Sequence, residues 1–415
     1  MQPKSSVHKG ILLMLFLSTL ILYFDRVNIS LLGPTLMKTF NWNDTQFGAI
    51  GSLFFVGYTI TQIPGGLLAD KFGGKKVLAF GNAWWSLFTI LSALGTSFSL
   101  MGIFRTGMGL GEGVNFPSDS QLIAKWIPQK LRARATGFNL SAIALGPLIA
   151  TPITVGILGA WGWKAVFVFF GILGFIWTLV WLKVGRDSPQ QHPGVTPEEL
   201  ELIQTKDELI AGEEKAHPYK SRHVWGLSIS YFFLLYTLYL FLSWLPTYLV
   251  QARHFSEGSL ALVGTVPWAV AFVTMNATGW VIDRMIKSGW HSGKARRLMI
   301  YIGLVGSAVF AVFGANAATS TSSLVLISIS MGFMGMCFSP YWALPIDYAP
   351  KSPGGISGLM NTWGNLAGIA APIVTGFLVT TTHSWNLALY ISAGLAVLGA
   401  IILAVTSFES KPASI

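Results

Sequence analysis

The chain has 415 residues, of which 52% are hydrophobic and only 11% are charged. Soluble domains carry about 25% charged residues, so this composition excludes most water-soluble folds. A helix needs about 20 apolar residues to cross a bilayer, and twelve such spans would use roughly 240 residues. The apolar runs are continuous and do not alternate with period two, which argues against a transmembrane β-barrel. The composition therefore predicts an all-α polytopic membrane protein.

Twelve apolar segments follow one another along the chain. They lie at about 11–36, 46–69, 77–97, 100–126, 135–158 and 163–184, and then at about 224–250, 259–286, 297–317, 322–346, 355–379 and 385–407. They predict two six-helix halves, 1–184 and 222–415, joined by a polar linker, 185–221. Within the linker, Thr196-Pro197-Glu198-Glu199 has the pattern of a capping box, which predicts a short amphipathic helix. We expect the linker to tether the halves; a regulatory role is the alternative.

The net charge of +10 could indicate nucleic acid binding, but the positions of the basic residues argue against it. Of the 27 Lys and Arg, three lie in one set of alternate loops, and 22 lie in the other set and the two tails. This asymmetry is typical of membrane topology and predicts that both termini are cytoplasmic. We therefore expect a multi-pass protein of the inner (plasma) membrane, in contact with lipid and not with nucleic acid. Cys337 is alone, and we expect no cofactor and no metal.

Three short motifs recur at offsets of 212 to 220 residues, at corresponding places in the two halves. The matched pairs are Gly66-x-x-x-Asp70-Lys71 with Gly279-x-x-x-Asp283-Arg284, Pro34-Thr35 with Pro246-Thr247, and Pro152-x-x-x-Gly156 with Pro372-x-x-x-Gly376. Parallel repeats with a site near the middle of the membrane are typical of secondary transporters. The repeats therefore predict two pseudo-symmetric halves.

These motifs and the layout of six, linker and six resemble the major facilitator superfamily over essentially the whole chain. Residues 23–28 are similar to the Tyr-x-Asp-Arg-x-Asn signature of its anion:cation symporter branch. Residues 105–117 are similar to that branch's Arg-x-x-x-Gly-x-x-Glu-(Gly/Ala)-x-x-x-Pro. The branch includes bacterial hexonate and hexuronate carriers and animal transporters of glutamate and sialate.

Four charged residues lie well inside the apolar segments: Asp25, Arg26, Arg105 and Glu112. A charge at membrane depth is unfavourable by roughly 2.5–3.5 kcal/mol, so each is a candidate for function. Arg105 and Glu112 share one helix face about 10 Å apart, whereas adjacent Asp25 and Arg26 point about 100° apart. The resemblance implies that Asp25 and Glu112 couple to protons and that Arg26 and Arg105 respond to them and to an anion. The alternative is a fixed salt-bridge cluster that locks segment 11–36 to segment 100–126.

The resemblance also implies substrate contacts in both halves. In the first half these are Tyr23 and Tyr58, together with Arg26 and Arg105. In the second half, the positions that match the family's contacts are Ser339, Trp342 and Asn361. Packing is the alternative for Trp342, and bridging between helices is the alternative for Asn361, whose rival is Asn365 one turn on.

The loops that contain the recurring Asp and basic residue resemble the family's gating loops. Asp70 and Lys71 form the first, and Asp283 and Arg284 form the second. In the family these charges pair across helices and hold the outward-facing state. The alternative is that they only set the topology.

The sequence as a whole predicts a proton-coupled symporter that imports a carboxylated organic anion by alternating access. Some animal members have an arginine in the seventh segment, but residues 231–236 carry no charge, so a monocarboxylate such as a hexonate or hexuronate fits best. An exporter of a carboxylate siderophore or drug is the alternative within the fold. A non-transporting anion sensor is the alternative from another class. We expect a monomer. We also expect no catalytic residues, because the chain has no metal motif and no nucleophile elbow.

Overall fold

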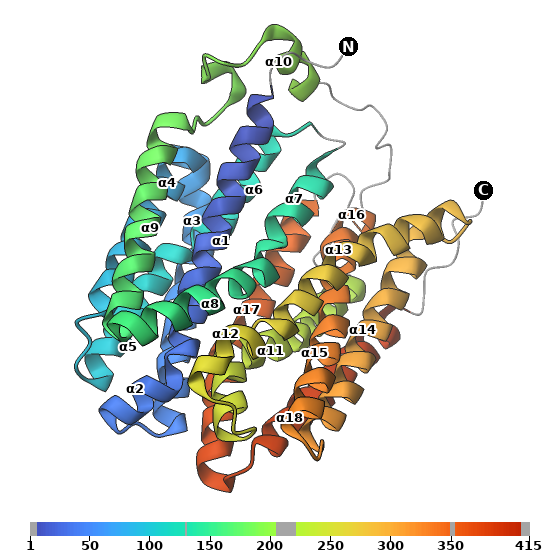
Figure 1. The fold of residues 1–415 in the computed structure, drawn as a ribbon. Coiled ribbons are helices and arrows are strands. Elements are labelled where there is room, and N and C mark those ends of the chain that lie inside the picture. The colour runs from blue at the N-terminus through green and yellow to red at the C-terminus, as the bar shows by residue number, and fades with distance from the viewer. Residues whose placement is uncertain (1–5, 129–130, 205–220, 349–352, 408–415) are drawn as a thin grey trace. The chain divides into compact units, whose positions relative to one another are not determined.

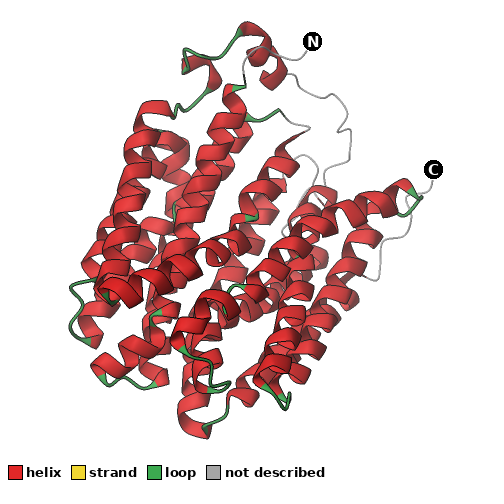
Figure 2. Ribbon diagram, viewed as in Figure 1, coloured by secondary structure: helices red, strands yellow, loops and turns green. Residues whose placement is uncertain are grey.

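The computed structural model describes residues 6–128, 131–204, 221–348 and 353–407. Within these ranges every regular element is a helix (Figure 2). The chain forms two compact units, residues 1–209 and 210–415. The predicted all-α fold is therefore confirmed. The linker predicted at 185–221 contains the division between the units, and its separate status stays a prediction.

The first unit contains ten α-helices among its described residues. In chain order (Figure 1) they are α1 (Val7–Leu31), α2 (Gly33–Phe40), α3 (Asp44–Phe72), α4 (Gly74–Ser92), α5 (Phe98–Glu112), α6 (Asn115–Trp126), α7 (Arg132–Leu140), α8 (Ala142–Trp161), α9 (Trp163–Val184) and α10 (Pro197–Gln204).

The second unit contains eight α-helices among its described residues. They are α11 (Arg222–Gln251), α12 (Leu260–Val263), α13 (Val266–Lys287), α14 (Ser292–Ala315), α15 (Ser320–Met336), α16 (Phe338–Tyr348), α17 (Pro353–Thr382) and α18 (Trp385–Ser407).

Several predicted segments are divided into two consecutive helices. The segment 100–126 is divided at residues 113–114, the segment 135–158 at Ser141, and the segment 322–346 at Cys337. The first segment is divided at Leu32, and Pro34 lies in the first turn of α2. Proline has no N–H to donate to the carbonyl of the preceding turn, which favours a new helix start at this point.

Ten helical stretches within the described ranges are long and apolar enough to cross a membrane. The predicted segments 77–97 and 100–126 are not among them. The second of these is divided, and its α5 has 15 residues that include Arg105 and Glu112. The first corresponds to α4, whose core face is polar at Asn82 and Thr89. The count of twelve spans therefore stays a prediction.

The two units repeat one packing scheme. In the first unit, α1 packs on α8 and α9, α3 on α5, and α4 on α5 and α9. In the second unit, α11 packs on α17 and α18, α13 on α15, and α14 on α15 and α18. Corresponding helices therefore have corresponding neighbours, in agreement with the motif repeats.

Two glycines allow α3 and α5 to touch along their backbones. A Cβ on Gly109 would clash with the carbonyl oxygen of Phe54, and a Cβ on Gly57 would clash with that of Thr106. The Thr106 hydroxyl also donates to the backbone oxygen of Leu53 at 3.2 Å. This close approach holds the α3 side chains against the charged residues of α1 and α5.

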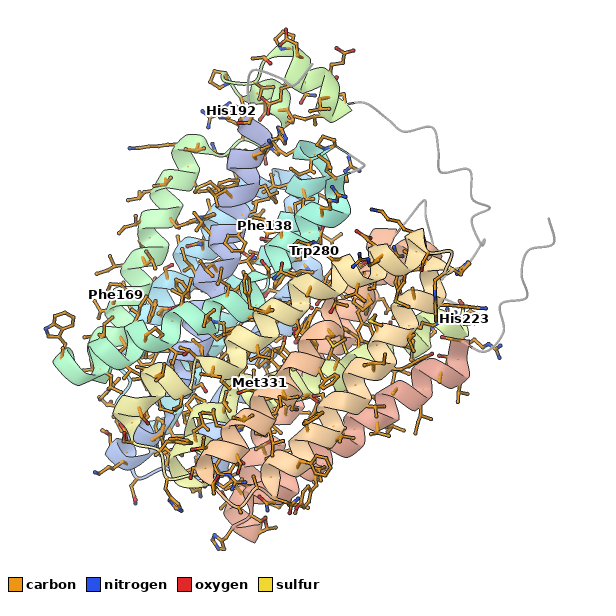
Figure 3. The ribbon with its side chains drawn as sticks, turned by 45° about the vertical axis from the view of Figure 1, so that its right-hand side comes forward. Phe138, Phe169, His192, His223, Trp280 and Met331 are labelled. Atoms are coloured by element: carbon orange, nitrogen blue, oxygen red, sulfur yellow. The ribbon has the colours of Figure 1, made fainter. Side chains whose placement is uncertain are left out.

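Large apolar side chains are both buried between helices and exposed on them. Met331 of α15 is fully buried, whereas Phe169 of α9 is 44% exposed and Leu179 of the same helix is 63% exposed (Figure 3). Exposed rings and leucines along a long apolar helix are expected where lipid covers the surface.

The predicted linker helix is present as α10, beside the start of α1 (Figure 1). The Thr196 hydroxyl accepts a hydrogen bond from the Glu199 backbone N–H at 3.3 Å, as a capping box requires. The fully buried Glu199 carboxylate also accepts from the His8 backbone N–H at 2.9 Å and contacts His8 Nδ1 at 2.5 Å. Because His8 lies in the first turn of α1, Glu199 places a negative charge at that helix N-terminus. Hydrogen bonds from its own backbone N–H and from Thr196 lower the pKa of Glu198, which faces solvent.

Candidate functional site

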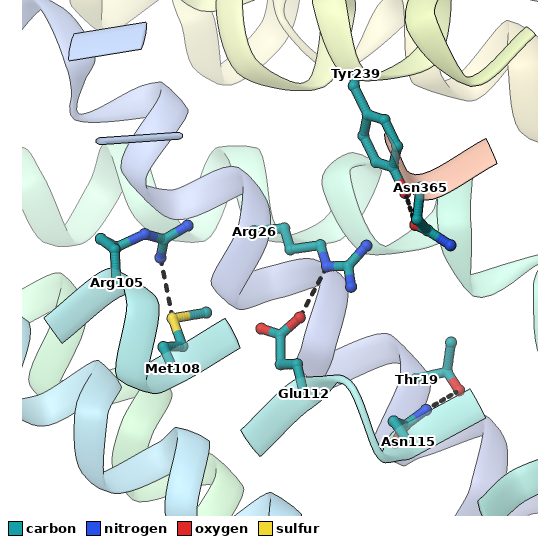
Figure 4. A network of polar contacts seen from close by, with 8 residues as sticks. All are labelled: Thr19, Arg26, Arg105, Met108, Glu112, Asn115, Tyr239 and Asn365. Atoms are coloured by element: carbon teal, nitrogen blue, oxygen red, sulfur yellow. Dashed lines mark hydrogen bonds and ion pairs between the residues drawn. The ribbon is translucent and has the colours of Figure 1, made fainter. Parts of the chain in front are cut away.

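A buried ion pair joins α1 to α5. Arg26 Nε donates to Glu112 Oε2 at 2.8 Å (Figure 4). Arg26 is 4% exposed and Glu112 is fully buried. The second carboxylate oxygen of Glu112, Oε1, has no hydrogen-bond partner among the described residues. Neither charge is solvated, so each depends on the other for compensation.

Aromatic rings surround the Arg26 guanidinium. Its central carbon lies 4.5 Å from the centre of the Tyr58 ring and 5.2 Å from the centres of the Tyr23 and Phe54 rings. The Phe55 ring centre is 5.6 Å away. Ring faces attract cations and exclude water. The structure thus brings the predicted residues Tyr23 and Tyr58 together around Arg26.

Asp25 is directed at a different neighbour. It is fully buried, and its Oδ2 has no hydrogen-bond partner among the described residues. Asn28 donates to Asp25 Oδ1 at 3.4 Å, and Asp25 has no ion-pair partner among the described residues. The side chains of Asp25 and Arg26 therefore diverge, as the helical geometry predicts.

Arg105 of α5 is 3% exposed and has no ion-pair partner among the described residues. Its guanidinium carbon lies 4.9 Å from the centre of the Phe54 ring, and its Nη1 donates to the sulfur of Met108 at 3.0 Å. Its Nε has no hydrogen-bond partner in the described part of the chain. A guanidinium can hold both oxygens of a carboxylate, and at Arg105 no carboxylate of these residues does so.

Phe54 connects the two arginines. The guanidinium carbons of Arg26 and Arg105 each lie within 5.2 Å of the centre of its ring. The first-unit site, defined here as Asp25, Arg26, Phe54, Tyr58, Arg105 and Glu112, therefore combines two cations, two carboxyls and an aromatic wall. A single protonation at Glu112 would change the charge that Arg26 experiences.

In the second unit, an aromatic cluster joins α11 to α16. Trp342 Nε1 donates to the Tyr231 hydroxyl at 3.1 Å. The Tyr231 ring centre lies 5.1 Å from that of Tyr341 and 6.5 Å from that of Trp342. The Tyr341 hydroxyl in turn contacts the Ser230 hydroxyl at 2.5 Å. Trp342 is half-buried.

The two candidate asparagines of α17 contact each other. Asn365 Nδ2 donates to the backbone oxygen of Asn361 at 2.7 Å and to its Oδ1 at 3.1 Å. Asn365 is buried, and its Oδ1 accepts from the Tyr239 hydroxyl at 2.5 Å, which ties α17 to α11. Asn361 is half-buried. Asn365 therefore bridges helices, and Asn361 remains the more accessible of the two.

Ser339 lies apart from this cluster. Its hydroxyl faces α13, where a Cβ built on Gly279 would stand 3.7 Å from it. The described residues show no hydrogen bond from Ser339 to Trp342 or Asn361. The structure therefore brings together Trp342 and Tyr231, and separately Asn361 and Asn365, but it does not join Ser339 to either pair.

The predicted gating residues are exposed. Gln121 Nε2 donates to Asp70 Oδ1 at 3.4 Å, and the Lys71 ammonium lies 5.2 Å from the centre of the Phe72 ring. Asp283 and Arg284 at the corresponding end of α13 are exposed as well. None of the four gating residues forms an ion pair with a described residue. Their gating role stays a prediction.

Sequence reasoning missed several members of these clusters. Phe54 lies one turn before Tyr58 on α3, and Met108 lies one turn after Arg105 on α5. Helical spacing could have found both, because residues three and four apart share a face. Tyr231 and Tyr239 of α11 have no such signal, since their partners come from other helices.

The model of the Major Facilitator Superfamily matches residues 15–372 of this chain. The chain belongs to this superfamily. The hexuronate transporter of Bacillus subtilis is 32% identical over 410 residues, which cover 97% of this chain and 96% of the relative. The probable galactarate/D-glucarate transporter of Escherichia coli is 32% identical over 413 residues, which cover 94% and 92%. These relatives confirm the predicted anion:cation symporter branch.

Solved structures agree on the fold of this superfamily member. A bacterial homologue of the human lysosomal transporter Spinster, captured in an inward-facing, occupied conformation, matches with a TM-score of 0.78. The match covers 99% of this chain and 100% of that chain at 18% sequence identity. The superfamily match and the two relatives make the protein a multi-pass membrane transporter of a small molecule.

Proposed function

We propose that this superfamily member is a proton-coupled symporter that imports a carboxylated sugar acid, such as a hexonate or hexuronate, by alternating access. The bacterial inner membrane is the proposed location. The observation on which the proposal rests is Arg105, a buried guanidinium without a carboxylate partner among the described residues, beside the buried Arg26–Glu112 pair.

The substrate class follows from the energetics of Arg105. A buried charge without a counter-charge is destabilising by several kcal/mol, whereas pairing with an anion offsets part of that penalty. The planar guanidinium matches the two oxygens of a carboxylate and stays protonated at physiological pH. The Phe54 ring under the guanidinium keeps water out, which strengthens the attraction. A substrate carboxylate at Arg105 supplies the missing counter-charge.

Proton coupling follows from the Arg26–Glu112 pair. Glu112 is positioned to accept a proton because its Oε1 has no hydrogen-bond partner among the described residues. Protonation removes the negative charge that Arg26 contacts through Nε, and an anionic substrate then becomes the favoured partner of Arg26. Loss of the proton restores the ion pair and displaces the anion. Asp25 next to Arg26 is the second coupling carboxyl in this proposal.

The second unit has neutral polar and aromatic groups of its own. Trp342 and Tyr231 offer an aromatic surface with a hydroxyl, and Asn361 offers a half-buried amide. Such groups suit the hydroxyls of a sugar acid. No charged residue occurs at 231–236, which favours a substrate with one carboxylate. The relatives named for hexuronate and for galactarate/D-glucarate support the sugar acid class.

Uptake into proteoliposomes tests the proposal. Purified protein should accumulate a labelled hexuronate when the outside is more acidic than the inside, and it should not accumulate the uncharged lactone or alditol. A dicarboxylic sugar acid tests the preference for a substrate with one carboxylate, and equal uptake of it contradicts that preference. A sodium gradient at equal pH is the control for the coupling ion.

Each arm has an outcome that contradicts the proposal. Equal uptake of acid and lactone removes the role of Arg105 as an anion site. Accumulation driven by sodium and not by protons removes proton coupling. If the protein binds the hexuronate but neither gradient drives its uptake, the protein is a sensor.

A further inference from the structure

The first unit contains a third buried carboxyl, Asp119 of α6, which has no part in the proposed coupling pair. It is 1% exposed and lies where α1, α6 and α7 meet. Thr19 Oγ1 is 3.0 Å from its Oδ2, Asn115 Nδ2 is 3.1 Å away and Asn139 Nδ2 is 2.9 Å away. Figure 4 shows Thr19 and Asn115 in contact with each other, at 3.3 Å. Three neutral donors thus converge on one oxygen of Asp119.

The other oxygen of Asp119, Oδ1, has no hydrogen-bond partner among the described residues, although it is buried. No cation pairs with Asp119 there either. The charged residues of the surrounding helices are directed elsewhere: Arg132 donates to the backbone oxygens of Ala124 and Ile127, and Lys125 and Arg134 are exposed. If Asp119 is ionised, only hydrogen bonds to Oδ2 stabilise its charge, and Oδ1 accepts no hydrogen bond from the described residues.

The hydrogen bonds alone do not require a carboxyl. The Oδ2 atom that accepts from Thr19, Asn115 and Asn139 could be the carbonyl oxygen of an asparagine, which carries no charge. A carboxyl adds the ability to bind a proton at Oδ1. A metal cation would need several oxygen ligands, but the hydroxyl and the two amide nitrogens approach Asp119 as donors. The geometry therefore favours a proton over a metal ion.

The position of Asp119 relates it to the coupling pair. Thr19 and Arg26 are seven residues apart on the continuous helix α1. Seven residues span about 10 Å of helix. Of the polar connections between α1 and the helices α5 and α6, Arg26 to Glu112 and Thr19 to Asp119 lie about two turns of α1 apart. The second lies nearer the end of the unit at which α1 begins.

We propose that Asp119 is a proton-binding site that accepts the proton released by Glu112 and passes it to water at the end of the unit where α1 begins. This inference rests on the proposed proton coupling for the source of the proton. The proton forms an O–H bond at Asp119 Oδ1, and the same bond breaks when water takes the proton away. Hydrogen bonds to an ionised carboxylate are about twice as strong as neutral ones, so protonation also weakens the connection among α1, α6 and α7.

Infrared difference spectroscopy of the purified protein tests this site without transport. A protonated buried carboxyl has a separate C=O stretching band that appears as the pH is lowered. The variant Asp25→Asn/Glu112→Gln/Glu199→Gln removes the other fully buried carboxyls of the described residues. A pH-dependent band should remain in this variant and should disappear when Asp119→Asn is added. If the band remains after Asp119→Asn, or if the triple variant has none, the proposal is wrong.

Thr19→Val is the matched control, because it removes one donor to Asp119 and leaves the carboxyl in place. The C=O stretching band of the protonated carboxyl should still appear in this variant, but at a frequency different from that in the wild-type protein. This control also tests the proposal if the multiple variants do not fold. If the band has the same frequency in Thr19→Val as in the wild-type protein, Asp119 is not the protonated carboxyl.

A transport measurement separates this inference from the proposed function. Asp119→Asn should slow pH-driven uptake by at least about tenfold, a modest part of what proton-transfer groups contribute, and should leave substrate exchange at equal pH intact. A titrating Asp119 in a protein without proton-driven uptake refutes the proposed function and not the site. Normal proton-driven uptake in Asp119→Asn refutes the relay and not the proposed function.

Discussion

The two units use one packing scheme for different chemistry. In the first unit, α1 is tied to α5 by the buried ion pair of Arg26 and Glu112. In the second unit, the corresponding helices α11 and α15 are tied by two hydroxyls, Tyr248 and Ser323, at 2.9 Å. A carboxyl paired with arginine can respond to a proton, whereas two neutral hydroxyls cannot do so near neutral pH. Under the proposed function, the first unit carries the proton coupling and the second unit contributes only neutral groups.

The polar centres differ in the same way. The first-unit site contains Asp25, Arg26, Arg105 and Glu112, all buried. The aromatic cluster of the second unit is built from tyrosine, tryptophan and serine, and α17 adds amides. Charge is thus concentrated where the account places proton and anion chemistry, and variants in the two units should have effects of different kinds.

Breaking the ion pair should have the largest effect on stability. Arg26→Met leaves Glu112 buried without its partner, so we expect a loss of about 3–5 kcal/mol in the free energy of unfolding, measured by denaturation in detergent. The matched change in the second unit is Ser323→Ala, which removes neutral hydrogen bonds to the Tyr248 hydroxyl and to the Gly314 backbone oxygen and should cost less, about 0.5–1.5 kcal/mol for each bond. Equal losses would remove the distinction between the units. Arg26→Met/Glu112→Leu should recover most of the lost stability.

Changes at Arg105 should weaken binding of the acid selectively. Arg105→Lys keeps the charge but loses the planar fork, and we expect binding weaker by about 1–3 kcal/mol in a calorimetric titration. Arg105→Ala should cost more, because the substrate carboxylate is then desolvated without a partner. Affinity for the uncharged lactone should change little. An equal loss for acid and lactone would make Arg105 a structural residue.

The contact between α10 and α1 lies in the first unit but outside the first-unit site. A variant of this contact tests whether the stability of the first unit also depends on charge outside that site. Glu199→Ala removes the carboxylate that accepts from His8, and an N-terminal cap is worth about 0.5–2 kcal/mol. We expect a lower melting temperature with unchanged substrate affinity. Glu198→Ala is the matched control, because Glu198 is next to Glu199 in the sequence but faces solvent. If both variants melt alike, the His8 contact contributes nothing.

Variants of the aromatic cluster should cause the smallest losses of substrate affinity. These losses should be the same for charged and uncharged substrates. Trp342→Phe removes the hydrogen bond to Tyr231 and keeps a ring, so affinity should fall by about 0.5–1.5 kcal/mol. The acid and its lactone should lose affinity equally. A loss confined to the acid would place anion recognition in the second unit as well.

Much of the fold could be predicted because apolar runs are a local signal. The segments 163–184 and 385–407 coincide with α9 and α18 at both ends. The breaks at residues 113–114 and at Cys337 were not predicted, because hydropathy does not change where a helix is interrupted. The capping box correctly located the start of α10, but its Glu199 also binds His8, 191 residues away in sequence.

The site could be predicted only in part. The rarity of charge in apolar segments identified Asp25, Arg26, Arg105 and Glu112. Sequence spacing could not decide that Glu112 pairs with Arg26 and that Arg105 has Phe54 and Met108 as neighbours, because those contacts depend on how α1, α3 and α5 pack. The Trp342–Tyr231 hydrogen bond was missed for the same reason.

The most direct test of the account compares two kinds of transport in Glu112→Gln. Proteoliposomes with this variant are assayed for hexuronate accumulation under an inward proton gradient and for exchange of labelled substrate at equal pH. Asp25→Asn is measured in parallel, and Trp342→Phe is the control from the second unit. We expect Glu112→Gln to abolish accumulation and retain exchange, and Trp342→Phe to retain both with reduced affinity. Unchanged gradient-driven accumulation in Glu112→Gln would contradict the claim that the buried charges of the first unit couple protons to the substrate.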